Sequence, residues 1–341
     1  MKLFTRLSER IRRNEPVPMF IGACLRGFSS VQRLGMWIRL HRPRTRVAAR
    51  VISFGNLTAG GTGKTPAVIE RACREYAAGE RVAVLTRGYG AVRTRLPLVY
   101  DPNSGETAAP ECFGDEAALI AASVPEVWVV RCPDRVAGGR EALERGCTVL
   151  ILDDGYQAVG LERDENILLI DATNPFGNGF LVPRGILREP VSALKRATEI
   201  IITRCDQAPE ALPEIESVLR RQAPEIPVHY AVHQPVSFRR LQDGREFPPE
   251  FLKGVAAYVV CGIGNPESLA RTLANLGITI RGMHALADHA AIPGTLLRKD
   301  CPVILTEKDA VRLGPVDCPD VYALAVSFAP YRPAASARAS M

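Results

Sequence analysis

Short apolar runs alternate with longer segments of helical periodicity along most of this chain. Unbroken apolar runs of this kind are typical of strands that are buried on both faces, as in a parallel sheet covered by helices. The pattern predicts strands at residues 47–54, 81–85, 127–131, 148–152, 167–171 and 199–203, and helices at 66–78, 115–123 and 133–145.

A second and smaller α/β pattern follows this first one. It is preceded by a polar, proline-rich stretch at 207–227 and by an expected connector at 234–249, with a turn at Asp243-Gly244. The later pattern predicts strands at 255–261 and 303–305, a helix at 266–276 and a helix from Lys308. We therefore expect three parts: N-terminal helices at 1–46, a core at 47–236, and a C-terminal domain at 237–341 with a disordered tail from about 332.

The composition fits a globular protein from a reducing compartment. Apolar residues make up 47% of the chain and charged residues 23%. The nine cysteines are odd in number and none forms a C-x-x-C pair, which argues against a disulfide scaffold and against a structural zinc site. No run approaches the ~20 apolar residues that span a bilayer, and no signal peptide is expected.

Positive charge is concentrated at the N-terminus. Residues 1–50 hold 12 basic and two acidic side chains, although the whole chain carries only +6. Apolar residues recur among these charges at helical spacing, for example Phe20, Cys24, Phe28 and Val31. This pattern favours basic amphipathic helices on an anionic membrane surface. A helix pair packed on the main domain would give the same periodicity. No nucleic-acid motif accompanies the charge, and the sequence identifies no protein partner.

A phosphate-binding loop follows the first predicted strand and precedes the first predicted helix. Glycines let backbone N–H groups approach phosphate oxygens, and a lysine and a hydroxyl then serve the β/γ-phosphates and Mg²⁺. The strict motif has glycine where this chain has Thr58. The predicted nucleotide-binding residues are Gly60, Gly61, Thr62, Gly63, Lys64 and Thr65.

A pair of carboxylates supplies the acidic partner that such a loop requires. The apolar run 149–152 ends in Asp153-Asp154, as in a Walker B strand. A parallel strand beside the loop would bring these carboxylates to Mg²⁺. Together these motifs predict an α/β fold: a P-loop NTPase-like, doubly wound, mostly parallel sheet, with a smaller C-terminal α/β domain and N-terminal amphipathic helices.

Several short sequence blocks follow one another over roughly residues 47–315. The blocks are 55–58 with 60–66, Thr86-Arg87-Gly88-Tyr89-Gly90, Gly114-Asp115-Glu116, 152–157, 183–190, 261–266, Asp288-His289 and Thr306-Glu307-Lys308-Asp309-Ala310. In this order they resemble the tetraacyldisaccharide 4′-kinase (lipid A 4′-kinase) family, and their number makes the resemblance specific. The family shares the Thr58 departure from the strict loop motif.

The resemblance implies an enzyme that transfers the γ-phosphate of ATP to the 4′-hydroxyl of a tetraacylated glucosamine disaccharide 1-phosphate. It implies ATP and Mg²⁺, an acylated disaccharide lipid as substrate, and a peripheral, monotopic position on the cytoplasmic face of the bacterial inner membrane. The N-terminal helices would then dock on that membrane.

The resemblance also implies roles for particular residues. Asp115 matches the catalytic carboxylate, and His289 the imidazole paired with it. An Asp–His pair suits removal of a hydroxyl proton during phosphoryl transfer. The arginines expected near the phosphates are Arg135 and Arg188, with Arg87 a weaker candidate; Lys64 completes the catalytic set, and the candidate Mg²⁺ ligands are Thr65, Glu116, Asp153 and Asp154.

Three positions depart from the family pattern, namely Ala91, Ala158 and Ala290. They affect substrate-facing detail rather than the nucleotide core. Two alternatives remain at this point: a soluble P-loop kinase for another acceptor, and a GTP-hydrolysing switch or metallochaperone. The nearest match to a guanine-selecting segment is Thr203-Arg204-Cys205-Asp206, which has arginine in place of lysine.

Overall fold

The computed structural model describes residues 10–11, 19–41, 43–89, 91–92, 96–287, 290–297, 300–314 and 316–333. The chain divides into two compact units. Unit 1 comprises Met1–Lys64, Asp154–Val232 and Pro330–Met341, and unit 2 comprises Thr65–Asp153 and His233–Ala329. The predicted boundaries after residues 46 and 236 stay a prediction, and most of the predicted tail lies outside the described residues.

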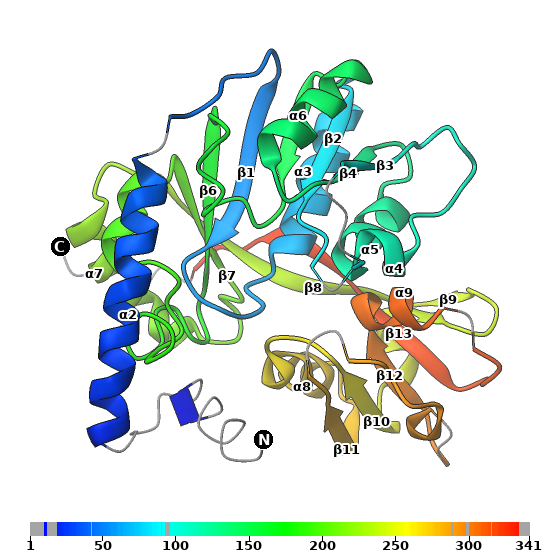
Figure 1. The fold of residues 1–341 in the computed structure, drawn as a ribbon. Helices are drawn as coiled ribbons and strands as arrows, with labels where there is room; N and C mark the ends of the chain where they lie inside the picture. The colour runs from blue at the N-terminus through cyan, green and yellow to red at the C-terminus, as the bar shows by residue number, and fades with distance from the viewer. Residues whose placement is uncertain are drawn as a thin grey trace. The chain divides into compact units, whose positions relative to one another are not determined.

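Unit 1 is built on parallel strands. Here β1 (Arg50–Asn56) pairs with β6 (Glu165–Asp171), β6 with β7 (Glu199–Thr203), and β7 with the start of β8 (Val228–Arg240), all in parallel (Figure 1). Because β1 and β6 are buried at every position after the first, their sequences show unbroken apolar runs rather than alternation. The helical elements of this unit are α2 (Met19–Leu40), η1 (Val191–Arg196), η2 (Pro209–Ala211) and α7 (Leu212–Gln222).

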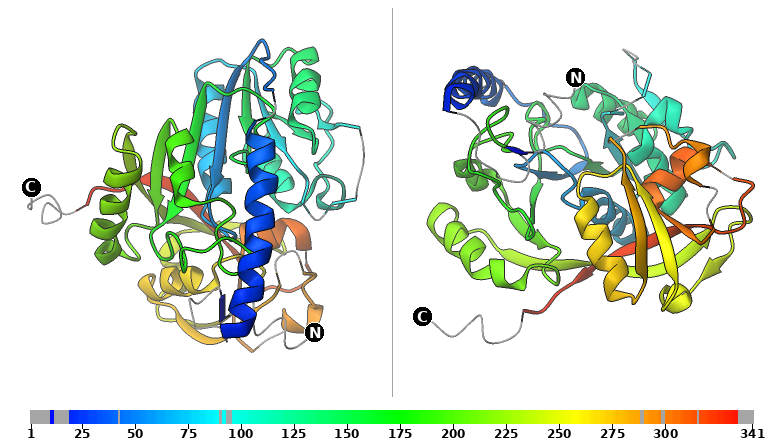
Figure 2. Two further views of the ribbon diagram at one scale, coloured as in Figure 1. Left: turned by 60° about the vertical axis from the view of Figure 1, so that its left-hand side comes forward. Right: turned by 90° about the horizontal axis from the view of Figure 1, so that it is seen from below.

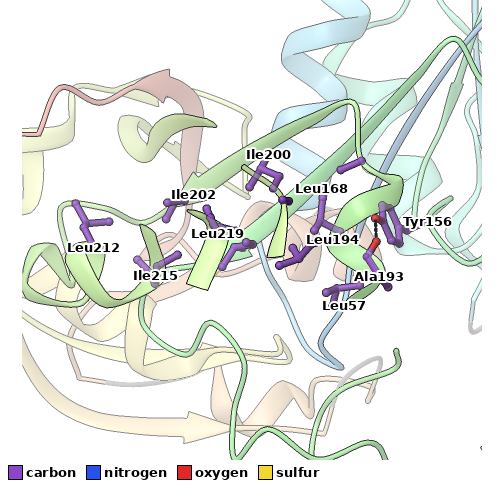
Figure 3. Close-up of a cluster of buried hydrophobic side chains, with 14 of the residues drawn as sticks. Leu57, Tyr156, Leu168, Ala193, Leu194, Ile200, Ile202, Leu212, Ile215 and Leu219 are labelled. Carbon is purple, nitrogen blue, oxygen red and sulfur yellow. Dashed lines mark hydrogen bonds between the residues drawn. The ribbon is translucent and has the colours of Figure 1, made fainter. Parts of the chain in front are cut away.

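A buried apolar cluster joins these elements. Figure 3 shows Ile200 and Ile202 of β7 and Leu168 of β6 in contact with the apolar side of α7 and with η1. Tyr156 is fully buried in the same cluster, and its hydroxyl donates to the carbonyl of Ala193 at 2.6 Å. This bond satisfies the one polar atom that the aromatic side chain brings into the core.

Unit 2 contains two groups of parallel strands. One has the order β5–β2–β4, with β3 antiparallel to β4; the other has the order β11–β10–β12–β13. The strands are β2 (Val82–Thr86), β3 (Leu98–Tyr100), β4 (Trp128–Arg131), β5 (Val149–Leu152), β9 (Glu246–Phe247), β10 (Ala256–Cys261), β11 (Thr279–Ala285), β12 (Val303–Thr306) and β13 (Val321–Pro330). The helical elements are α3 (Lys64–Ala77), α4 (Pro110–Phe113), α5 (Asp115–Ser123), α6 (Arg135–Glu144), η3 (Pro249–Leu252), α8 (Pro266–Asn275), η4 (Gly294–Leu296) and α9 (Glu307–Leu313).

The predicted strands and helices are confirmed with small shifts at their ends, but a helix and a strand lie where the sequence predicted none. The proline-rich stretch 207–227 contains α7, whose Leu212, Ile215 and Leu219 are buried at helical spacing. Pro213 is compatible with this helix because it stands in the first turn, where no N–H is needed. The connector expected at 234–249 is largely strand, since β8 runs on to Arg240. The predicted turn is present, with Gly244 at φ 73°.

The N-terminal prediction of an amphipathic helix is confirmed in part by α2, a single continuous helix (Figure 2). One side of α2 packs on the rest of unit 1, where the Ser29 hydroxyl donates to the carbonyls of Leu181 and Val182 at 3.0 and 3.2 Å. Among the described side chains of α2, four large apolar ones are exposed, with relative exposures of 66% for Phe28, 59% for Leu34, 56% for Trp37 and 48% for Ile38. No helix in the described part of the chain is long and apolar enough to cross a membrane.

Candidate active site

The phosphate-binding loop of unit 1 lies at the carboxyl edge of three parallel strands. The loop follows β1, Asp171 ends β6 and Thr203 ends β7. Gly60 and Gly63 have φ angles of 131° and 82°, which side chains rarely tolerate, and α3 begins at Lys64. Ligands bind at this edge in open α/β sheets.

Two side chains at the end of β7 support the loop by donating hydrogen bonds to its backbone carbonyls. The Arg204 guanidinium donates to the carbonyl of Gly61 at 2.9 Å and is ion-paired with Asp171. The Thr203 hydroxyl donates to the carbonyl of Thr62 at 3.0 Å. A trans peptide places C=O and the following N–H on opposite sides. The N–H groups of residues 62 and 63 therefore point away from these two side chains, as phosphate binding requires.

The P-loop lysine is held between an amide and a carboxylate. The Lys64 ammonium donates to Asn56 Oδ1 at 3.2 Å and lies 3.5 Å from Asp154 Oδ1. Asn56 is fully buried, and its Nδ2 donates to the carbonyl of Thr58 at 2.7 Å, which fixes the amide. The Asn56 amide thus holds the loop at Thr58, through the carbonyl of that residue and, at 3.4 Å, through its hydroxyl.

The Asp154 carboxylate forms ion pairs with two cationic side chains. The Arg188 guanidinium donates to both of its carboxylate oxygens at 2.8 and 2.7 Å, and Lys64 approaches Oδ1. Burial alone would raise the pKa of Asp154, but the charges and hydrogen bonds of Lys64 and Arg188 outweigh it and lower the pKa to about 2. The carboxylate is thus ionised at neutral pH, and the region is poised to receive an anion or a metal ion.

The two blocks 152–157 and 183–190 meet around these groups. Gln157 Nε2 donates to the backbone carbonyl of Asn56 at 3.0 Å and to Glu189 Oε1 at 2.9 Å. Glu189 is fully buried, and Arg196 pairs with it through both terminal nitrogens. Gln157 Oε1 also accepts from Arg188 Nη1 at 3.5 Å, so Gln157 links the buried Glu189–Arg196 pair to the Arg188 side chain.

The segment that carries Arg188 is also bonded to the lead-in of the loop and to α2. Ala59 N donates to the carbonyl of Ile186, and Arg188 N to that of Leu57, each at 2.6 Å. On its other side, Gln32 Nε2 donates to the carbonyl of Arg188 at 3.1 Å. A continuous set of hydrogen bonds therefore links α2 to the phosphate loop.

Two predicted residues of unit 2, Arg135 and Asp153, are buried at the end of β5. Arg135 donates to the carbonyl oxygens of Cys132 at 2.6 Å and of Asp153 at 3.1 Å. Asp153 is 2% exposed. The contacts of Arg135 support the turn after β5, and its role toward phosphates stays a prediction.

Asp115 and Glu116 begin α5 in unit 2. Gly114 precedes them at φ 90°, and a Cβ there would lie 2.9 Å from the carbonyl oxygen of Tyr89. Both carboxylates meet cations from α9: Arg312 Nη1 lies 3.3 Å from Asp115 Oδ2, and Lys308 Nζ lies 3.2 Å from Glu116 Oε1. His289, the predicted partner of Asp115, lies outside the described residues.

Sequence reasoning missed several residues of this site. Asn56, Gln157 and Glu189 lie within the quoted blocks but received no role, because their hydrogen bonds join segments about 30 to 100 positions apart. Arg204 was considered only as a substitute for a guanine-selecting lysine, whereas it supports the phosphate loop. The position of Arg204 in the sequence could have indicated this role. It directly follows β7, which is parallel to β6, and β6 lies beside the strand that leads into the phosphate loop.

The donor chemistry of these residues fits Mg²⁺. Within the described ranges, no group of three or more His, Cys, Asp or Glu side chains could hold a metal by itself. Mg²⁺ in phosphoryl-transfer sites is usually bound by one or two carboxylates together with substrate phosphates and water. The ionised Asp154 beside Lys64 fits that kind of site.

This fold and this loop define a P-loop nucleotide-binding protein. Residues 21–339 match the family described as tetraacyldisaccharide-1-P 4′-kinase. Similar curated proteins are tetraacyldisaccharide 4′-kinases: that of Anaeromyxobacter sp. is 39% identical over 81% of this chain and 77% of its own length. That of Syntrophus aciditrophicus is 40% identical over 80% and 77%.

A solved structure agrees with these sequences. LpxK from Aquifex aeolicus, in complex with ATP, superposes with a TM-score of 0.71 at 27% identity and covers 92% of this chain and 96% of its own. The chain described here belongs to the tetraacyldisaccharide-1-P 4′-kinase family. The expected family and fold class are confirmed, and membership removes the switch and metallochaperone alternative.

Proposed function

We propose that this protein transfers the γ-phosphate of ATP to the 4′-hydroxyl of a tetraacylated disaccharide 1-phosphate in lipid A biosynthesis. The observation that carries this proposal is the braced phosphate loop, with Lys64 fixed between Asn56 and Asp154, in a chain of this kinase family. Phosphoryl transfer depends mainly on positioning and on charge stabilisation, and these contacts provide both.

On the nucleotide side, residues 60–65 bind the phosphates and Lys64 neutralises the β/γ-phosphate charge. Arg188 adds a second cation that shares Asp154 with Lys64. Thr65, Asp153, Asp154 and Glu116 are the proposed ligands of Mg²⁺ or of its waters. The metal, when bound, supplies further neutralisation of phosphate charge.

On the acceptor side, Asp115 takes the proton of the 4′-hydroxyl. As that proton leaves, the hydroxyl oxygen forms a bond to the γ-phosphorus and the bond from phosphorus to the ADP oxygen breaks. ADP departs with the electron pair of that bond. His289 is proposed to orient or balance the charge of Asp115.

A peripheral position on the cytoplasmic face of the inner membrane is the second part of the proposal. The exposed Phe28, Leu34, Trp37 and Ile38 of α2 and the basic N-terminus support it. Aromatic and aliphatic side chains enter the interface while arginines bind anionic headgroups. The enzyme would then bind its lipid substrate at the surface of the membrane that contains it.

The test is the transfer of ³²P from γ-labelled ATP, with Mg²⁺, to a tetraacylated disaccharide 1-phosphate in detergent micelles. Wild type should label the lipid, whereas Lys64→Ala and Asp115→Ala should lose activity by roughly 10²-fold or more, since each removes a group that acts on the reacting atoms. Circular dichroism and thermal unfolding check that both variants fold. ATP hydrolysis by wild type without labelled lipid would argue for another acceptor, such as a soluble one.

A further inference from the structure

The short helix α9 presents two cations to the two acids at the start of α5. Lys308 and Arg312 are four positions apart and therefore share one face of the helix. Arg312 meets Asp115, and Lys308 meets Glu116, at 3.3 and 3.2 Å. The Arg312 and Asp115 side chains are only 14% and 9% exposed. The block 306–310 that contains Lys308 is one of the sequence blocks to which the resemblance gave no role.

The Arg312 guanidinium is itself held in place. Its Nη2 donates to Asp309, which is fully buried. Asp309 accepts from the N–H of Gly262 at 3.1 Å and from the Thr306 hydroxyl at 2.6 Å. Thr306 also caps α9 by accepting from the N–H of Asp309. The guanidinium thus lies between one carboxylate anchored to the backbone and a second one, Asp115.

We propose that α9 positions the acidic pair: Arg312 holds the Asp115 carboxylate through Oδ2, and Lys308 holds Glu116 through Oε1. The inference rests on the proposed function, in which Asp115 accepts the hydroxyl proton. Arg312 and Lys308 are positioning residues, because they act through the two acids.

Stability alone is a weak reason for such an arrangement. Replacing a buried ion pair with well-packed apolar residues is often neutral or stabilising, so charge pairs in a protein interior are poor evidence of a stabilising role. A carboxylate that must accept a proton in a fixed geometry, in contrast, loses rate when it shifts by about 1 Å. A rigid, two-pronged guanidinium is well suited to prevent that shift, and lysine is not its equivalent.

The experiment compares Arg312→Met, Arg312→Lys and Lys308→Met with wild type in the micelle assay. We expect Arg312→Met to lower kcat on the order of 10²-fold with KM for ATP within about twofold, because the phosphate loop is untouched. Arg312→Lys should recover part of that loss, and Lys308→Met should show a smaller decrease. The matched control is Arg281→Met, which removes an exposed ion pair with Asp300 in the same unit.

A second comparison separates positioning from folding. If Arg312 acts through Asp115, then adding Arg312→Met to Asp115→Asn should change the residual rate by no more than about twofold. Independent effects, in which the two losses multiply, would overturn the inference. Arg312→Met leaves Asp309 without its cation and could therefore prevent folding. In that case Lys308→Met still tests whether α9 positions the acidic pair, since this variant keeps the ion pair between Arg312 and Asp309.

Two further outcomes distinguish a failure of this inference from a failure of the proposed function. An active wild type with kcat of both Arg312→Met and Lys308→Met within twofold of it would overturn this inference and leave the proposed function intact. A wild type that transfers no label to the lipid would overturn the proposed function and this inference with it.

Discussion

Asp154 shows how a single carboxylate can organise a phosphate site. Its two oxygens are shared by Arg188 and Lys64, and its backbone has φ 51° in the left-handed region. The strain of such a conformation in a residue other than glycine is compatible with a functional position. The conformation belongs to the turn that directs the carboxylate toward the two cations.

The depressed pKa of Asp154 predicts a particular dependence of stability on pH. Its folded pKa is about 2, against an ordinary value of 3.8, so its charge stabilises the fold above pH 4 and this contribution is lost as pH falls from about 4 toward 2. Asp154→Asn removes the contribution. The difference in Tm between wild type and Asp154→Asn should therefore shrink over that range.

The control for this measurement is Asp300→Asn, whose carboxylate is 65% exposed in a surface pair with Arg281. Surface pairs contribute little to stability. A constant difference in Tm between wild type and Asp154→Asn from pH 5 to pH 2 would contradict the assigned ion pairing.

At the scale of elements, one side of α2 is hydrogen-bonded toward the candidate active site, and the other side is exposed to solvent. Its inner side bonds the segment 181–188, and that segment bonds the lead-in of the phosphate loop. Two layers of hydrogen bonds thus separate the outward-facing apolar residues of α2 from Lys64. The apolar periodicity predicted a helix here, but it could not predict which groups Ser29 and Gln32 bind.

This network predicts that Gln32→Ala affects the nucleotide site. Loss of its bond to the Arg188 carbonyl should loosen that segment and raise KM for ATP by roughly 2- to 5-fold, the equivalent of one hydrogen bond of about 0.5–1 kcal/mol. Binding to anionic vesicles should not change. Steady-state kinetics and vesicle sedimentation measure the two effects.

Arg33→Ala is the matched control, because Arg33 is an exposed residue of the same helix, next to Gln32. It should leave KM for ATP unchanged. Equal effects of Gln32→Ala and Arg33→Ala on KM would show that α2 acts only through its general stability.

At the scale of the whole molecule, charge and apolar exposure point to the same surface. The first 50 residues carry 12 basic side chains, and α2 exposes large apolar residues. Isolated exposed apolar side chains are common on soluble proteins, but four on one helix beside a basic segment are typical of an interfacial element.

The combined variant Trp37→Ser/Ile38→Ser should therefore weaken binding to vesicles that contain anionic lipid. Because these side chains are 56% and 48% exposed, their replacement should not lower Tm by more than about 2 °C. Raising the salt concentration should weaken binding further by screening the arginines. Sedimentation with vesicles at low and high salt measures both effects.

Val236→Ser, a change at a 50% exposed apolar residue of β8, is the control and should sediment as wild type does. Unchanged sedimentation of the Trp37→Ser/Ile38→Ser variant would remove α2 from the membrane contact.

The sequence by itself determined the α/β class, the phosphate loop and most of the parallel strands. It could do so because these features are local: an apolar run, a glycine pattern before Lys64, and a pair of aspartates after a strand. It failed at α7 and β8, where prolines and polar residues obscured a half-buried helix and strand.

Tertiary structure alone decided which side chains support the site. Asn56 against Lys64, Gln157 against Glu189, and Arg204 against the Gly61 carbonyl are pairs of partners that no spacing rule predicts. The pairing of Arg312 with Asp115 joins residues almost 200 positions apart. The physical reason is that sequence periodicity reports which face of an element is buried, whereas hydrogen-bond and charge partners depend on which elements the fold makes neighbours.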